Sequence, residues 1–376
     1  MGTSTDKLTE RDLNRALLAR QGLLARRRTG VEEAVAGLVG LQAQVPGAPW
    51  TALWSRIDGF DPEAASELLE SRRLVRMSTL RGTIHLHGAE DALTLRRWCQ
   101  PVNDRGRYGT AVYRKELTGV TPEALEAAAR EVLHLEGPLT NARLGAALAE
   151  RFPGNAPATL AWAVRDRLPL VQVPPRGLWR RSGATRSTTA EEWLGRGLPE
   201  SVDVPGLIRR YLAAFGPASV MDAQAWCGLT RLGEVFERLR PELRVFQDAG
   251  SGRELFDLPD APRPDPDTPA PVRFLPDYDN VLLAHKDRAR VLDPASWAAL
   301  AARGNGLRPF VLVDGRLAGG WSWEREKDGA VVLTVELFRS TDPQPVETEA
   351  AALLSFLAPD AEERRVRLQG RDELRE

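Results

Sequence analysis

Apolar residues recur at helical spacing, i, i+3, i+4 and i+7, in two stretches of the chain, residues 122–187 and 203–258. Each stretch predicts three helices followed by two short strands, which is the order of a winged helix-turn-helix unit. In both, a Gly-Pro turn precedes a hydroxyl residue, Thr140 or Ser219, that is suited to cap the second helix. The predicted helices are 122–134, one from Thr140, 156–168, 204–215, one from Ser219 and 229–239, and the predicted strands are 170–174, 177–181, 243–247 and 253–257.

The first 90 residues fit the same plan with an insertion. A tight turn at Arg81-Gly82 predicts a hairpin between two strands. We therefore predict three tandem winged-helix units. The predicted elements of the first unit are helices from Thr9, Val31, Pro49 and Pro62 and strands 74–80 and 83–87.

The chain changes character beyond Pro259. Residues 260–269 are rich in proline and aspartate and predict a linker. Most of the chain beyond this linker predicts strands. The fold class is therefore predicted to be α+β, with three winged-helix units and a small C-terminal β-barrel-like domain. Strands are predicted at 272–275, 281–285, 310–313, 317–324 and 331–338, a helix at 347–357, and domains at 1–118, 119–200, 201–260 and 261–376.

The composition is typical of a soluble globular protein, with 43% hydrophobic and 27% charged residues among 376. Two cysteines, Cys99 and Cys227, cannot build a disulfide framework. The N-terminus lacks the apolar segment of a secretion signal, and no apolar run is long enough to span a membrane. We therefore expect a cytoplasmic protein.

The net charge of -1 hides an uneven distribution. Residues 71–115 carry ten cations against three acids, a net charge of +7, and residues 165–186 carry +5, whereas residues 248–279 carry -5. Such arginine clusters suit a polyanion, although solvated helix faces give the same pattern. If they bind DNA, these arginines should share a face with the candidate site.

The most unusual short segment is Gln42-Ala43-Gln44, which lies between an apolar helix and Pro46-Gly47. In an extended segment residues i and i+2 share a face, so both glutamines would project together into a cleft. The alternative is that they satisfy backbone groups at a helix end. A glutamine amide can orient water or place its dipole against a cation, but it is no strong acid or base. Such a pair suits a leaving group that needs no protonation, as with N7-alkylguanine, which is already cationic.

Two other segments carry candidate side chains. His85 and His87 alternate on a predicted strand, where they line a site, face DNA or simply pack; a metal site is disfavoured because no further ligands appear at a recognisable spacing. A polar turn at residues 277–280 separates two predicted strands. It fits a structural Asx turn as well as it fits a functional site. The chain has no phosphate-binding or dinucleotide-binding loop and no zinc spacing, so no cofactor or metal is expected.

In this order and at these separations, the motifs resemble the AlkZ-like bacterial DNA glycosylases. The resemblance rests on the tandem winged-helix plan, the Gln-Ala-Gln segment, the hairpin at residues 81–85 and residues 274–280, and it covers about Leu8 to Leu357. It implies a C-shaped scaffold that holds the duplex, and a catalytic pair at Gln42 and Gln44. Glutamine rather than aspartate at the second position resembles the branch that gives self-resistance to genotoxins such as azinomycin. The residues assigned to DNA contact are Arg81, Thr83, His85, Asn280, His285 and Arg288.

The resemblance predicts a monofunctional DNA glycosylase that acts as a monomer on double-stranded DNA carrying bulky N7-alkylguanines, including interstrand crosslinks. A crosslinked base cannot flip fully, so an open cleft is expected, and a deep aromatic-lined pocket beside Gln42 would count against it. Two alternatives stay open. One is a winged-helix regulator without catalysis, and the other is a resistance protein that sequesters the genotoxin itself.

Overall fold

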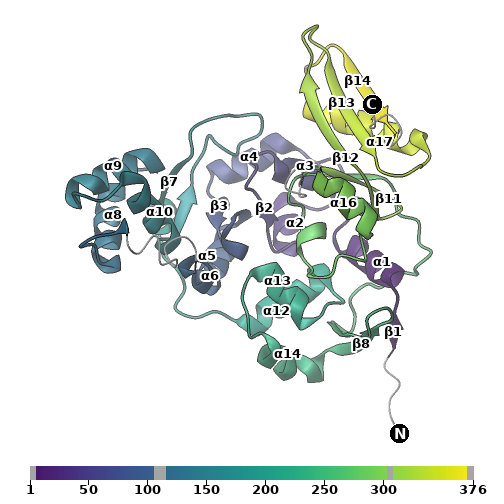
Figure 1. Ribbon diagram of the computed structural model, residues 1–376, viewed down its shortest axis with the longest axis horizontal. Helices are drawn as coiled ribbons and strands as arrows, with labels where there is room; N and C mark the ends of the chain where they lie inside the picture. Colours follow the sequence, from purple (N-terminus) through teal and green to yellow (C-terminus); the bar gives the residue numbers. More distant parts are fainter. Residues whose placement is uncertain (1–5, 106–115, 303–307, 371–376) are drawn as a thin grey trace.

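The structure is a computed structural model that describes residues 6–105, 116–302 and 308–370 (Figure 1). The strands of this part of the chain form three sheets. Figure 1 shows helices α8–α10 (within residues 122–167) at one side of the molecule, strands β12–β14 (within residues 316–369) at another, and β2 (Leu41–Gln42) and β3 (Leu74–Ser78) between them. The described residues contain no helix that is long and apolar enough to cross a membrane.

The second predicted unit has the expected order of elements. Thr140 caps α9 by accepting a hydrogen bond from the Arg143 backbone N–H at 3.3 Å, as its place after the Gly-Pro turn predicts. Apolar residues of the three helices form a core of their own, in which Leu125, Leu148 and Leu160 are buried. The elements are α8 (Pro122–Glu136), β5 (Leu139–Thr140), α9 (Asn141–Arg151), α10 (Pro157–Arg167), β6 (Leu170–Gln172), β7 (Arg186–Thr189) and α11 (Ala190–Leu194).

The third predicted unit also has three helices and two paired strands. Ser219 and Asp222 form a capping box at the start of α13, because each side chain accepts from the other's backbone N–H. Strand β1 (Lys7–Leu8) from the N-terminus pairs in parallel with β8. The elements are α12 (Val204–Phe215), α13 (Val220–Cys227), α14 (Gly233–Leu239), β8 (Arg244–Asp248) and β9 (Glu254–Asp257).

The first predicted unit shares a sheet with the second. The sheet has the strand order β2-β4-β3-β6-β7-β5, and β3 pairs with β6 through Met77 opposite Val171. The winged-helix identity of the units and their C-shaped arrangement stay predictions. The elements of the first unit are α1 (Glu10–Arg20), α2 (Val31–Gly37), β2 (Leu41–Gln42), α3 (Ala48–Trp54), α4 (Pro62–Glu70), β3 (Leu74–Ser78), β4 (Ile84–Gly88), α5 (Ala89–Trp98) and α6 (Gln100–Asp104).

The C-terminal sheet is open, so the β-barrel-like domain predicted from the sequence is wrong. Its strand order is β10-β11-β12-β13-β14, and no pairing joins the edge strands β10 and β14 within the described residues. Helix α17 packs against the sheet and buries Leu353 and Leu354 in a core shared with β13. The elements are β10 (Arg273–Leu275), α15 (Asn280–Leu283), α16 (Pro294–Ala302), β11 (Phe310–Val313), β12 (Arg316–Arg325), β13 (Val331–Leu337), α17 (Pro343–Leu357) and β14 (Arg364–Gln369).

Two predicted strands are absent for identifiable reasons. Residues 177–181 form a loop, because Arg180 has a left-handed φ of 52° and the Trp179 N–H donates to Ser66 Oγ of α4 at 2.9 Å instead of to a strand. The apolar run 281–285 lies largely in helix α15, whose start is capped by Asp279. Short apolar runs fit a buried helix as well as a strand, which explains the second error.

The two largest cores cross the predicted divisions of the chain. One joins α1 to α12–α15 and β11, and the other joins α2–α4 to the C-terminal sheet. The Pro-Asp-rich segment 260–269 is an irregular strap tied to α1: the side chains of Arg11, Arg15 and Arg20 donate to carbonyls at positions 266, 268 and 262, at 2.7, 2.6 and 3.2 Å. Residues distant in the sequence therefore meet around the first unit.

Candidate active site around the Gln-Ala-Gln segment

The Gln-Ala-Gln segment is an extended piece of chain at the edge of the six-stranded sheet. Gln42 pairs with His85 of β4, and the Ala43 N–H donates to the Ile84 carbonyl at 2.7 Å. A left-handed turn leads into it from α2, with φ of 52° at Val39 and 92° at Gly40. At Gly40 a Cβ atom would lie 2.1 Å from the His87 ring, so this position needs glycine for space as well as for conformation.

Both glutamine side chains bond to the β3–β4 hairpin. Arg81 Nη2 donates to Gln42 Oε1 at 2.8 Å, and the Ile84 N–H donates to Gln44 Oε1 at 3.3 Å. Because both partners can only donate, the atoms that face them must be carbonyl oxygens. Gln42 is buried, with 7% exposure, whereas Gln44 is exposed. Each oxygen keeps a second lone pair for a ligand or a water molecule.

Arg81 links this site to the third unit. It sits at the hairpin turn with a left-handed φ of 55° and also donates to the Trp226 carbonyl of α13. Burial of the guanidinium lowers the pKa of Arg81 to about 10, so it stays charged at neutral pH. Arg81 therefore brings a fixed positive charge to Gln42.

The two histidines of β4 are buried and neutral. His85 Nδ1 donates to the Thr83 carbonyl at 3.0 Å, and its Nε2 accepts from Arg81 at 3.3 Å. Burial and the neighbouring Arg81 charge hold the pKa of His85 well below 6.5, and burial lowers the pKa of His87 to about 4. The Thr83 hydroxyl donates to the Leu80 carbonyl at 3.1 Å. None of these three side chains is an acid or base that titrates near pH 7.

Arg76 also holds the segment. From the sequence it was counted only as one member of a basic cluster. Its Nη2 donates to the Ala43 carbonyl at 2.8 Å and its Nη1 to the Arg176 carbonyl at 3.1 Å. Burial, helped by the Arg176 charge, lowers the pKa of Arg76 to about 10. A lone charge in the otherwise apolar run Leu74–Met77 was the available signal of an internal role.

The C-terminal half supports the segment through α15. Asn280 is buried, and its Nδ2 donates to the Gly40 carbonyl at 2.9 Å. The preceding Asp279 forms a two-pronged buried ion pair with Arg56, at 2.8 and 2.9 Å. Asn280 thus lies directly behind the turn that leads into Gln42.

Neither His285 nor Arg288 forms a hydrogen bond with the glutamine pair among the described residues, although, in addition to burial, the Arg288 charge helps to lower the pKa of Arg81. His285 Nε2 bonds to the Phe215 carbonyl at 2.9 Å, and burial lowers the pKa of His285 to about 3. The Arg288 guanidinium lies 5.1 Å from the centre of the Trp297 ring. The DNA contacts assigned to Arg81, Thr83, His85, Asn280, His285 and Arg288 stay predictions.

Several arginines of the basic clusters are structural. Arg76 and Arg96 are buried, and Arg96 donates to carbonyls at the C-terminal end of α10. Arg73 pairs with Glu32, and Arg180 pairs with Asp360. The net charges counted along the sequence therefore overstate the charge available to DNA. Arg107, Arg114 and Lys115 of the first cluster lie outside the described residues.

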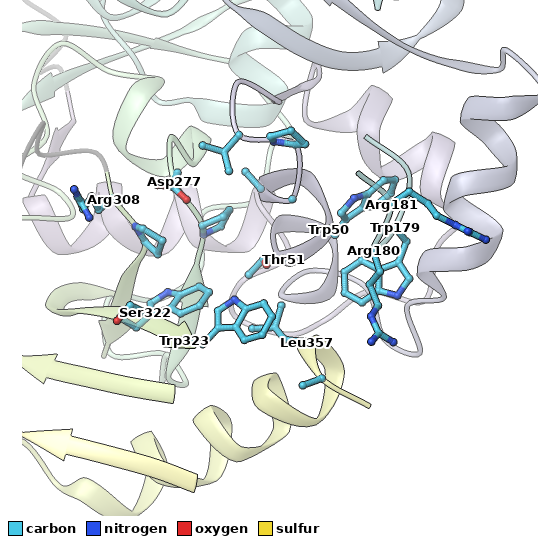
Figure 2. Close-up of a pocket in the computed structure, with 18 of the residues that line it drawn as sticks. Trp50, Thr51, Trp179, Arg180, Arg181, Asp277, Arg308, Ser322, Trp323 and Leu357 are labelled. Atoms are coloured by element: carbon cyan, nitrogen blue, oxygen red, sulfur yellow. The ribbon is translucent and has the colours of Figure 1, made fainter. Parts of the chain in front are cut away.

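A pocket of about 580 Å³ begins immediately after the segment, at Val45, Pro46 and Gly47. This aromatic-lined pocket adjoins the segment, which is the kind of feature that counts against an open cleft at Gln42. Neither Gln42 nor Gln44 lines it, however, so it does not enclose the glutamine pair, and the open cleft stays a prediction. In Figure 2, Arg180 and Arg181 lie near Trp179 at one side, and Asp277 and Arg308 lie at the other. Its aromatic lining residues are Trp50, Trp179, Trp321 and Trp323.

The described residues include no group of three or more histidine, cysteine or carboxylate side chains that could hold a metal ion. Both cysteines, Cys99 and Cys227, are buried and free. The segment itself offers two oriented amides, with buried arginines that fix the backbone and one of the amides.

Comparison with known proteins places this arrangement in a family. Residues 35–356 match the family described as "DNA glycosylase AlkZ-like". The chain is 28% identical over 362 residues to the "Interstrand DNA cross-link repair glycosylase" of Streptomyces sahachiroi, a match covering 89% of this chain and 92% of the relative. The solved structure of Streptomyces sahachiroi DNA glycosylase AlkZ has the same mixed α+β fold, with a TM-score of 0.73, 22% identity, and coverage of 97% of this chain and 100% of that chain. The chain belongs to the AlkZ-like DNA glycosylase family, which confirms the resemblance seen in its sequence.

Proposed function

We propose that this DNA glycosylase hydrolyses the N-glycosidic bond of bulky N7-alkylguanines in double-stranded DNA, interstrand crosslinks included, and leaves an abasic site. The protein acts as a monomer, since one chain carries several candidate DNA-binding elements. A DNA substrate also implies that it works in the cytoplasm. The cross-link repair named for the 28% identical relative supports the choice of lesion.

The proposed chemistry uses Gln42 and Gln44 to hold the attacking water. Their carbonyl oxygens accept hydrogen bonds from the water and face the positive charge that develops on the deoxyribose. The water oxygen bonds to C1′ and loses a proton to solvent. The alkylated guanine leaves with the electron pair of the broken bond and becomes neutral, so no protein acid has to protonate it.

The observation that carries this proposal is the way the segment is fixed. Gln42 is held by Arg81, Ala43 by Arg76 and Gly40 by Asn280, so two side chains of the β3–β4 hairpin and one of α15 hold five residues in one geometry. Residues that only capped a helix end would not require such support. Rigid placement of dipoles before the reaction is what makes electrostatic catalysis effective.

The test is excision of N7-methylguanine and of a bulky N7-alkylguanine from duplex DNA, read as alkali-sensitive strand breaks. The Gln42→Ala, Gln44→Ala double variant should lose about a hundredfold or more in rate. Gln344→Ala, which removes an exposed glutamine of α17, is the matched control and should keep the wild-type rate. Wild-type excision by the double variant would refute the proposed role of the pair.

Family membership favours this function over a non-catalytic DNA-binding regulator. A regulator would shift DNA of a particular sequence and leave the lesion in place. Binding of a free alkylating agent in the absence of DNA would instead support sequestration.

A further inference from the structure

The pocket beside the segment has aromatic walls that are fixed by contacts within the protein. Trp321 is fixed, because its indole N–H donates to the Leu275 carbonyl at 2.9 Å. Trp179 is fixed by stacking on Phe356, with ring centres 4.6 Å apart. Trp50 is buried in the same wall. The walls are therefore in place before any ligand arrives, which lowers the entropic cost of binding.

Trp323 is the part of the pocket that a ligand would cover. It is 45% exposed, although it follows the buried Trp321 by two residues on β12. The large apolar side chains that stand out as exposed in the described residues are Val45, Leu135, Met221 and Trp323, and two of these four border the pocket. Exposed apolar side chains at the edge of a concave site give a ligand apolar surface to bury.

The size and charge of the pocket narrow the choice of ligand. About 580 Å³ is in the range of pockets that bury a drug-sized molecule. The charged residues that line it are Asp277 and four arginines, Arg180, Arg181, Arg308 and Arg325. Arg180 is paired with Asp360, and the other three arginines still outnumber Asp277. An excess of cations around aromatic walls fits an aromatic group carried on a polyanion such as DNA.

We propose that this tryptophan-lined pocket receives the planar aromatic appendage of a bulky adduct attached to guanine in DNA, while the adjacent glutamine pair acts on the glycosidic bond. The inference rests on the proposed function, because it assigns the bulky part of that substrate to a site. The direct continuity of Gln44 with Val45 places the two sites next to each other along the chain.

The experiment compares the affinities of two duplexes that carry either N7-methylguanine or N7-(1-pyrenylmethyl)guanine at the same position. A 2′-fluoro group on the lesion sugar slows loss of the base, so fluorescence anisotropy reports binding to intact DNA. The wild-type protein should bind the pyrenyl duplex more tightly. Trp323→Ala should lower this preference about tenfold, the equivalent of about 1.4 kcal/mol, because stacking on one aromatic ring is lost.

Two further variants make the result specific. Trp323→Phe keeps an aromatic platform and should keep most of the preference. Leu135→Ala removes an exposed apolar side chain of α8, which is 71% exposed and outside the pocket, and should leave the preference unchanged.

The outcomes separate the inference from the proposed function. An unchanged preference in Trp323→Ala would overturn the inference, and equal weakening for both duplexes would do the same, because the pocket would then hold an extruded base common to both. Excision is measured in parallel on unfluorinated DNA. Failure of the wild-type protein to excise either lesion would overturn the proposed function, and the binding preference would still decide the inference.

Discussion

The helices of the second unit, α8–α10, pack around a core that they make themselves, within residues 125–170. The Gln-Ala-Gln segment is held in the opposite way, by Arg76, Arg81 and Asn280 and by close packing of Gly40 on His87. One region depends on neighbours in the sequence and on apolar contacts, and the other on distant residues and buried polar groups. Changes to the second kind of region should be more costly, because a buried polar group without its partner is strongly unfavourable.

The largest contrast is expected at two left-handed glycines. Gly40 has φ of 92° and a Cβ would meet His87, whereas Gly154, between α9 and α10, has φ of 86° and open space around it. Gly154→Ala should cost about 1–2 kcal/mol of unfolding free energy from the backbone alone. Gly40→Ala adds the overlap with His87 and should cost about 3–5 kcal/mol. Urea unfolding measures both, and equal losses would show that the segment is not tightly held.

A second pair of variants compares arginines. Arg76→Met leaves the Ala43 carbonyl without its partner and should cost about 2–3 kcal/mol of stability. It should also slow excision, because the segment is released. Arg151→Met removes an exposed ion pair with Glu131 between α9 and α8, which should hardly affect stability. Unfolding curves and single-turnover rates for both variants test this, and a stable, fully active Arg76→Met protein would contradict it.

Acid should weaken the region around the segment. The pKa of His87 is about 4 in the folded protein, below its ordinary value of 6.5, so between these values the unfolded state binds more protons. Stability is therefore full above pH 6.5 and falls as the pH drops toward 4. The loss from His87 alone should be about 2 kcal/mol at pH 5. His87→Gln should reduce the change in urea midpoint between pH 7 and pH 5, and an unaltered change would assign the acid sensitivity elsewhere.

The smallest expected effect is on the pH dependence of the reaction. Glutamine does not titrate, the pKa of His85 lies well below 6.5, and the pKa of Arg81 is about 10. The single-turnover rate of excision should therefore vary by less than about twofold between pH 6.5 and pH 9. A tenfold fall per pH unit on acidification would reveal a titrating base and would argue against the two amides.

The helices of the repeats were predicted well, because the signals for each helix lie within its own residues or next to them. Helix α12 begins and ends as predicted, at Val204 and Phe215, since an apolar stripe and an Asp203 cap are both local. The loop around Trp179 and the open C-terminal sheet were not predicted. Their form is decided by contacts with α4 and α17, which a local pattern does not contain.

The candidate site was predicted in part. The motif and its extended backbone follow from Pro46-Gly47 and the i, i+2 spacing, and the structure has the segment extended beside β4. The functions of the residues around it did not follow. Arg76 was counted only with a basic cluster, and it bonds to the backbone of the segment. Asn280 bonds to the backbone of the turn before the segment, and the DNA contact assigned to it stays a prediction. Whether a charged side chain is buried depends on tertiary packing, and a count of charges along the sequence does not contain that information.

The strap that ties residues 260–269 to α1 has a consequence for synthesis on the ribosome. Asn14 of α1 also bonds to the carbonyls of Arg290 and Gly315, at 2.7 and 2.8 Å. Helix α1 is therefore translated about 15–60 seconds before these partners at ordinary elongation rates. The second unit can close its core long before then. We expect the apolar face of α1, with Leu17 and Leu18, to stay exposed during this interval, and folding of the glutamine segment to be among the final events.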